Sequence, residues 1–193
     1  MLAYVSWHRP RAGAERAAYE RALERFHRSL AHRPPSGFHG SAGARLATIP
    51  WLEGGAGYED WYLLEDWTAL GVLEMAAVSQ GHLGAHDAVA KLAGTEVAAV
   101  YRLLEGSAHP GEAAVAAWVT TTPGYQPELA ALLGDGIDPR RASLWRRALV
   151  LGPAPQYCLL APEPPAGIAS TRLPEGWHAH SAPREPLYSG PYS

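Results

Sequence analysis

The sequence predicts an α+β protein made of two β-α-β-β-α-β units in tandem, of which the second is degenerate. Residues 1–105 contain segments with strand or helix periodicity in that order. After a linker at residues 106–112 the same order begins again, but a proline-rich stretch takes the place of the second helix. We therefore expect residues 113–193 to form a degenerate second unit with a proline-rich tail.

The first unit opens with a strand, a helix and a second strand. Residues 2–8 are rich in side chains that favour strands, and Pro10 ends the segment. Residues 14–31 repeat large apolar side chains at helical spacing, and two consecutive prolines end this helix. Residues 37–49 are rich in glycine, which predicts a bent or bulged strand.

The first unit closes with a strand, an interrupted helix and a fourth strand. Residues 58–67 are rich in aromatic side chains and predict a clear strand. Thr68 is placed to cap the helix that follows, and the Ser-Gln-Gly sequence at residues 79–81 interrupts it. Residues 95–104 supply the fourth strand, which completes the split β-α-β arrangement of a ferredoxin-like unit.

The second unit repeats this pattern with fewer helical residues. Residues 113–120 predict its first strand, and residues 127–133 predict a short helix with a proline near its start. Residues 143–151 and 156–161 predict two strands around a hairpin loop, and residues 177–188 predict an edge strand interrupted by prolines. The second unit has too few helical residues to cover its own sheet. We therefore expect its sheet to pack against the sheet of the first unit within one chain.

Composition and charge exclude several classes of protein. The chain has 193 residues, of which 47% are hydrophobic and 18% charged, which is typical of a folded globular protein. Its formal net charge of -3 argues against nucleic acid or an anionic membrane as a partner. The single cysteine, Cys158, and the short apolar run at the N-terminus predict a cytoplasmic protein without a signal peptide.

Residues 61–90 carry a resemblance to a known family. Glu65 and Trp67 end the third predicted strand, Ser79 follows twelve residues after the tryptophan, and His82 lies in the next helical segment. This order resembles the antibiotic-biosynthesis-monooxygenase family of dimeric α+β barrels, over the first half of the chain. The resemblance implies two sheets paired as a barrel, usually between two chains, and here the second half is expected to supply the partner sheet.

The residues that heme-degrading members of this family use are mostly missing. Those members have an Asn on the first strand, a Trp at the end of the third and a His on the following helix. Trp67 matches the Trp, but Ser6 stands in place of the Asn, and Ala76 or Ala77 stands in place of the His. The sequence contains no Asn at all. The resemblance therefore implies the fold rather than heme degradation, and no cofactor is predicted.

Strand alternation predicts the candidate ligand site. Alternate side chains on the first strand share one side, as do alternate side chains on the third. If these two sides face the barrel interior, they form an aromatic pocket with a few polar groups, in which His8 and Glu65 are candidate catalytic bases. The alternative is that the aromatic side chains simply fill the barrel. The candidate ligand-binding residues are Tyr4, Ser6, His8, Trp61, Glu65 and Trp67.

Two pairs of histidines have spacings that metal ligands use. His82 and His86 are four residues apart and would share one face of a helix. His178 and His180 would point the same way on a strand. A metal site needs three or more converging ligands, so no metal is predicted. The alternatives are a solvent-facing or subunit-facing helix for the first pair and a solvated tail for the second.

The sequence leaves two functions open. The first is a cofactor-independent monooxygenase-like or isomerase-like enzyme that acts on a small aromatic compound. The second is a non-catalytic ligand-binding or assembly module of the same fold. The expected partner is a small apolar or aromatic ligand, and a homo-oligomer is the rival to sheet pairing within one chain. The absence of Asn and the single lysine, Lys91, are typical of a heat-adapted protein or of a GC-rich genome.

Overall fold

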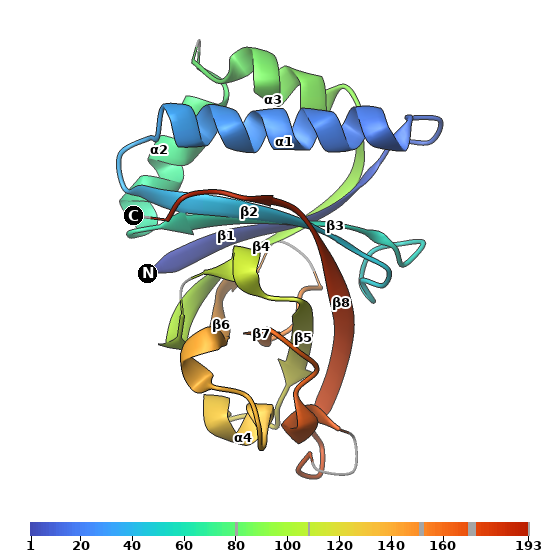
Figure 1. Ribbon diagram of the computed structural model, residues 1–193, viewed down its shortest axis with the longest axis vertical. Helices are drawn as coiled ribbons and strands as arrows, with labels where there is room; N and C mark the ends of the chain where they lie inside the picture. The colour runs from blue at the N-terminus through green and yellow to red at the C-terminus, as the bar shows by residue number, and fades with distance from the viewer. Residues whose placement is uncertain (80, 108, 151–152, 170–172, 193) are drawn as a thin grey trace.

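Eight strands form one closed barrel, and helices pack against its outside (Figure 1). The computed structural model describes residues 1–79, 81–107, 109–150, 153–169 and 173–192. Around the barrel the strands run in the order β1-β3-β2-β8-β5-β7-β6-β4, and each neighbouring pair is antiparallel. The chain therefore has the α+β fold that its sequence predicts.

The first half forms a ferredoxin-like sheet in the order β4-β1-β3-β2, with α1, α2 and α3 on one side of it (Figure 1). A register shift between Phe38 and Gly40 is the bulge expected in the glycine-rich strand. The elements are β1 (Leu2–Pro10), α1 (Arg16–His32), β2 (Phe38–Leu46), β3 (Gly57–Leu64), α2 (Trp67–Ala77), α3 (Leu83–Ala90) and β4 (Ala93–Gly106).

The second half repeats the same strand order, as β8-β5-β7-β6. In the described residues its second helix is reduced to the single turn η3, so this unit is degenerate as predicted. Residues 151–152 of the predicted hairpin lie outside the described residues. The elements are η1 (Pro110–Glu112), β5 (Val115–Thr120), α4 (Leu129–Leu133), η2 (Pro139–Arg141), β6 (Ser143–Val150), β7 (Tyr157–Ala161), η3 (Ala166–Ile168) and β8 (His178–Ser189).

The two sheets join edge to edge and close the barrel within one chain. Strand β2 pairs with β8, and β4 pairs with β6, so neither sheet of the pair keeps a free edge. Inside the barrel, Nε of Arg184 on β8 lies 3.0 Å from Oε1 of Glu59 on β3, and Nε1 of Trp7 donates to the other oxygen of Glu59 at 2.8 Å. This buried ion pair links the two halves across the interior.

Aromatic side chains fill the barrel interior, which was one of the two alternatives predicted. Ala3, Val5 and Trp7 of β1 point inward, and Trp61 and Trp145 lie against each other at a ring distance of 5.2 Å. A separate apolar layer, which includes Leu30 and Leu64, lies between the helices and the first sheet. The first sheet is therefore covered on both sides, which explains why both faces of its central strands are apolar.

The end of the third strand differs from the prediction. Strand β3 stops at Leu64, and Asp66 caps α2 by accepting a hydrogen bond from the Ala69 amide at 3.0 Å. Thr68 is therefore inside the helix and is not its cap. Trp67 begins the helix and is 45% exposed, whereas Ala69 in the same turn is buried, so the first turn packs on the sheet with Trp67 facing outward.

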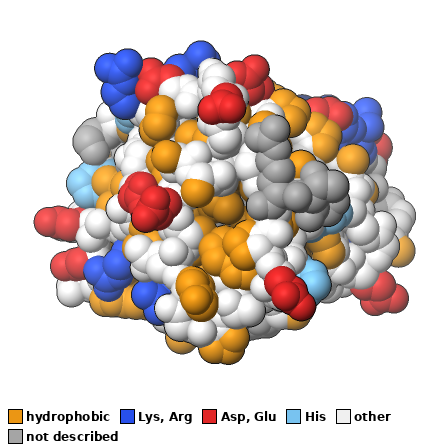
Figure 2. All heavy atoms as spheres, turned by 90° about the horizontal axis from the view of Figure 1, so that it is seen from below, with side chains coloured by type: hydrophobic (Ala, Val, Ile, Leu, Met, Phe, Trp, Pro, Cys, Tyr) orange, Lys and Arg blue, Asp and Glu red, His pale blue; other side chains and the backbone are white. Residues whose placement is uncertain are grey.

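One face of the molecule can be compared with the modest net charge (Figure 2). In the view of Figure 2, apolar side chains gather toward the middle of the face, and basic and acidic side chains are interspersed around its margin. Such a face lacks the continuous basic stripe that binds nucleic acid. In the described ranges no helix is both long and apolar enough to cross a membrane.

Candidate functional site

A cavity of about 460 Å³ lies between the outer face of the first sheet and the helices. Its apolar walls come mainly from α1, α2 and α3, and its polar groups come mainly from the strands. The apolar lining includes Leu23, Phe26, Leu70, Leu73, Val78 and Val89. The polar lining consists of Tyr4, Ser6, His8, Tyr19, Asp60, Tyr62, Glu74, His86 and Glu96.

Strand register puts three of the predicted residues here. Val5 pairs with Trp61, and Ser6 pairs with Asp60, so Ser6 and Asp60 share the outer face while Trp61 points into the barrel. Tyr4 and His8 follow Ser6 onto the outer face and line the cavity. The expectation that they face the barrel interior was wrong, because alternation divides a strand into two faces without saying which face meets the helices.

The other three predicted residues lie elsewhere. Trp61 is fully buried in the barrel interior, on the opposite side of the sheet. Glu65 and Trp67 follow the last residue of β3 and are exposed to solvent, so strand alternation no longer applies to them. The predicted grouping of His8 with Glu65 is therefore wrong, and the carboxylate that faces His8 is Asp60.

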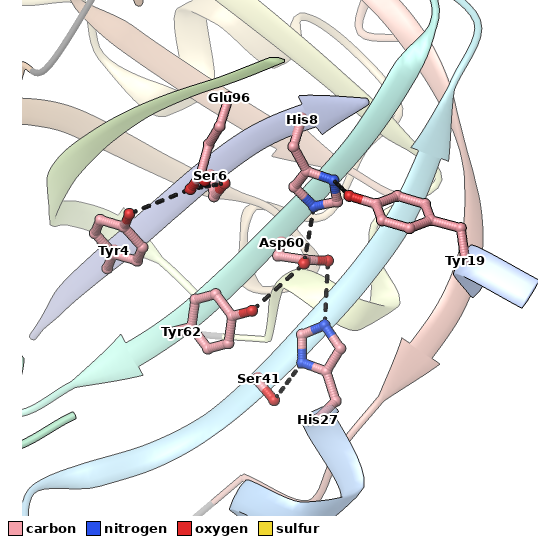
Figure 3. A network of polar contacts seen from close by, with 9 residues as sticks. All are labelled: Tyr4, Ser6, His8, Tyr19, His27, Ser41, Asp60, Tyr62 and Glu96. Atoms are coloured by element: carbon pink, nitrogen blue, oxygen red, sulfur yellow. Dashed lines mark hydrogen bonds and ion pairs between the residues drawn. The ribbon is translucent and has the colours of Figure 1, made fainter. Parts of the chain in front are cut away.

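Asp60 is the centre of a buried polar network (Figure 3). Its Oδ2 lies 2.9 Å from Nε2 of His8, and its Oδ1 lies 3.1 Å from Nε2 of His27. The hydroxyl of Tyr62 donates to Oδ2 at 3.4 Å. His27 comes from α1, so the network ties this helix to the strands beneath it.

Each histidine also contacts a hydroxyl through its second nitrogen. Nδ1 of His8 lies 2.8 Å from the hydroxyl of Tyr19, and Nδ1 of His27 lies 2.8 Å from Oγ of Ser41 (Figure 3). An ionised carboxylate only accepts hydrogen bonds, so an imidazole that contacts Asp60 in its neutral form must carry its proton on Nε2 and accept from the hydroxyl at Nδ1. The result is a continuous chain from Tyr19 through His8, Asp60 and His27 to Ser41.

The electrostatics of this network keep Asp60 ionised. Burial raises the pKa of the Asp60 carboxyl, but His27 and His8, through their charges when they are protonated and through their hydrogen bonds, lower it by more, so the net pKa lies well below its ordinary value. Burial, followed by the negative charge of Asp60, raises the pKa of Tyr19. Tyr19 therefore stays protonated and can donate to His8.

A second polar group lies at the exposed edge of the cavity. Oε1 of Glu96, an exposed residue on β4, accepts a hydrogen bond from Oγ of Ser6 at 2.7 Å and from the hydroxyl of Tyr4 at 3.5 Å. Burial, and after it the charge of Glu96, raises the pKa of Tyr4. The cavity thus has a buried Asp60 end and a solvent-facing Glu96 end.

Gly43 on β2 makes room for the Asp60–His27 pair. A Cβ atom at this position would lie 2.9 Å from Oδ1 of Asp60 and 3.0 Å from Nε2 of His27. Both distances are shorter than a carbon normally approaches these atoms, so any larger residue would push the pair apart. The glycine-rich composition of this strand therefore has a local function that strand periodicity does not reveal.

The sequence analysis did not identify the site residues that reach His8 and Ser6 from distant parts of the chain. Asp60 carries a signal, because it is a carboxylate inside an otherwise aromatic and apolar strand. His27 carries another, because it lies on the apolar face of α1 between Leu23 and Leu30. Tyr19 and Glu96 have no such signal, since only tertiary packing brings them to His8 and Ser6.

The first histidine pair does not converge. His82 lies just before α3, where its Nδ1 is 3.1 Å from Oγ of Ser29 on α1. His86 lines the cavity, and its Nδ1 lies 3.4 Å from Oδ1 of Asp87. In the part of the chain that the structure describes, no group of three or more His, Cys, Asp or Glu residues is placed to hold a metal ion.

Comparisons with known proteins identify solved structures of similar fold but no family for this chain. No protein-family model and no curated protein matches the chain. Two solved structures named "putative monooxygenase" match it along its length. The protein from Fusobacterium nucleatum is 10% identical, with a TM-score of 0.55 and coverage of 100% of this chain and 96% of its own. The protein from Lactobacillus acidophilus is 8% identical, with a TM-score of 0.56 and coverage of 98% and 95%.

A third solved structure has the same architecture. It is an anthrone oxidase-like protein that is 10% identical, with a TM-score of 0.53 and coverage of 97% of this chain and 91% of its own. At such low identity these matches show the fold alone. The chain shares their α+β barrel fold, and the likeness extends over both halves of the chain rather than only the first.

Proposed function

We propose that the cavity binds a small aromatic compound and that Tyr19, His8 and Asp60 accept a proton from it. The observation that carries this proposal is a buried, ionised carboxylate that orients an imidazole at the wall of an aromatic cavity of about 460 Å³. A volume of this size suits a small ligand, and strongly perturbed titratable groups are concentrated at functional sites.

The network offers a route for the proton. The substrate donates an acidic O–H or C–H proton to the Tyr19 oxygen while the proton of Tyr19 moves to Nδ1 of His8, 2.8 Å away. The imidazolium that forms is stabilised by Asp60 at 2.9 Å. The substrate is left as an anion whose negative charge is spread over its aromatic system.

The anion has two fates that match the two reaction classes left open by the sequence. Protonation at another carbon completes an isomerisation. Alternatively, the carbanion is oxidised by dioxygen, so that a CH₂ group becomes a carbonyl, one oxygen atom enters the product and the other leaves as water. The solved structures with the same fold include proteins named for monooxygenase and anthrone oxidase activity. Oxidation by dioxygen is therefore the reaction to test first.

One observation favours the alternative, a non-catalytic binding protein. Both nitrogens of His8 are hydrogen-bonded inside the protein, and Nδ1 of His27 lies 2.8 Å from Oγ of Ser41. Nε2 of His27 meets Oδ1 of Asp60 at 3.1 Å as an ion-pair contact without hydrogen-bond geometry. A network that is paired in this way can hold α1 on the sheet without meeting any substrate. In that case the cavity binds its ligand and releases it unchanged.

Anthrone is a suitable probe, because its CH₂ group lies between two aromatic rings and is acidified by a carbonyl. Oxygen uptake and quinone absorbance would be measured for the unmodified protein, Tyr19→Phe and the control Tyr125→Phe, whose side chain is 65% exposed. We expect catalysed oxygen uptake, a loss of at least about tenfold in Tyr19→Phe through loss of the proton acceptor, and no change in the control. Binding without turnover would support the non-catalytic alternative, and failure to bind anthrone or its quinone would reject the proposal.

A further inference from the structure

A second cavity, of about 330 Å³, opens at one end of the barrel and shares no lining residue with the first. The loop between β2 and β3 contributes Trp51, and β5 contributes Trp118 and Thr120. Strand β8 contributes His178 and His180, which line the cavity and do not form the solvated tail that was one alternative for them. Prolines complete the wall.

The aromatic rings of this cavity are held in a fixed stack. Trp118 and His180 are directly opposite each other on paired strands, and their rings stack at 5.8 Å with an interplanar angle of 14°. Trp51 meets Trp118 edge-on at 4.9 Å and 86°. Trp118 is only 2% exposed, so its position is set by the barrel core rather than by solvent. The cavity therefore has flat walls built mainly from aromatic rings and prolines, with a few polar groups.

Three buried polar atoms of this lining lack a partner. Nε1 of Trp51, Nε1 of Trp118 and Nε2 of His180 are each buried without a hydrogen bond to any described residue. Among the other barrel tryptophans, Trp7 donates to Glu59 and Trp145 donates to Ser143, whereas Nε1 of Trp61 in the barrel interior also has no partner among the described residues. A buried donor without an acceptor is unfavourable, and most such groups in native proteins are paired. Three of the seven unpaired buried side-chain atoms of the described residues belong to this one cavity lining, so a single occupant that supplies acceptors would satisfy them together.

We propose that this barrel-mouth cavity is a binding site for a small aromatic carboxylate. An indole N–H can only donate, so the occupant must present acceptor atoms to Trp51 and Trp118. One carboxylate has two oxygens and about four lone-pair positions, enough for both indoles and for Nε2–H of His180. The described residues that line the cavity include no Asp or Glu to repel an anion. The flat walls suit one or two fused aromatic rings, at the small end of ligand cavities.

The indole N–H signals of the seven tryptophans allow a direct test by ¹H–¹⁵N NMR. Naphthoate would be titrated into the full-length protein, with naphthalenemethanol as the matched ligand that lacks the carboxylate. Trp51→Phe and Trp118→Phe assign the two signals. We expect saturable downfield shifts of both with naphthoate, little change with the alcohol, and no change at exposed Trp67. His180→Phe keeps a stacked ring but removes Nε2, and should weaken binding about tenfold or more, whereas the same change at exposed His32 should not.

Three results would overturn the proposal. The first is no shift at either indole, which would mean that water alone satisfies these donors. The second is equal binding of the alcohol, which would reject recognition of a carboxylate. The third is unchanged affinity in His180→Phe. If Trp118→Phe fails to fold, Trp51→Phe and His180→Phe still decide the outcome. No tryptophan is among the described residues that line the larger cavity, so these signals are independent of the proposed catalysis, and Tyr19→Phe should leave the titration unchanged.

Discussion

Replacing Asp60 by Asn tests whether this buried carboxylate holds the site together. Asp60 is 2% exposed and meets His8 at 2.9 Å and His27 at 3.1 Å. The amide is nearly the same size but offers one acceptor where the carboxylate offers two, so one imidazole loses its partner or must change tautomer. Removing one member of a buried ion pair costs about 3–5 kcal/mol. We therefore expect Asp60→Asn to lower the free energy of unfolding by about that amount.

Urea unfolding at a series of pH values provides the measurement, with Asp135→Asn at an exposed position as the control. The folded-state pKa of Asp60 is depressed, so its contribution is fully present above the unfolded-state pKa of about 3.9 and is lost as pH falls further. The difference between the unmodified protein and Asp60→Asn should therefore shrink below about pH 4. A loss below about 1 kcal/mol at neutral pH, or a difference that does not change with pH, would refute the reasoning.

Three further changes test the fold and the site. Gly43→Ala should lower the free energy of unfolding in urea by about 1–3 kcal/mol, because its Cβ would lie 2.9 Å from Asp60. In the control Gly84→Ala the new Cβ meets nothing within 4 Å, so the change should be neutral or stabilising. Equal effects of the two changes would reject the steric argument. Trp67→Ala should lower the free energy of unfolding by less than about 1 kcal/mol because Trp67 is exposed, whereas Trp61→Ala should lower it by about 3–5 kcal/mol because Trp61 is buried. The reverse order would contradict the placement of these two residues. Truncation after Glu105 removes the strands that pair with β2 and β4, so light scattering should detect aggregation or a new dimer; a soluble, heat-stable monomer would show that the second half is dispensable.

Local patterns in the sequence were sufficient to predict the order of the elements. The helical spacing of Tyr19, Leu23, Phe26 and Leu30 predicts α1, because a helix that covers a sheet must present one apolar face. The order of strand and helix periods begins again after the linker, and this repetition predicts the second unit. The apolar character of both faces of β3 predicts that the open side of the sheet is covered, and the closed barrel confirms it.

The candidate site could be predicted only in part. Tyr4, Ser6 and His8 were grouped correctly because side chains two apart on a strand share a face. Their companions were assigned wrongly, because the pairing of Val5 with Trp61 is a property of two strands and cannot be read from either strand alone.

By itself, the sequence determined the alternation of strands and helices, the two-unit plan and the need to cover an apolar sheet, because these depend on spacing between neighbours in the chain. Only the tertiary structure decided which face meets the helices and which residues meet at Asp60. His8, Asp60 and His27 come from three separate elements, and their contacts depend on strand register and on how α1 lies across the sheet. The same holds at the barrel mouth, where Trp51, Trp118 and His180 meet because the two sheets close on each other.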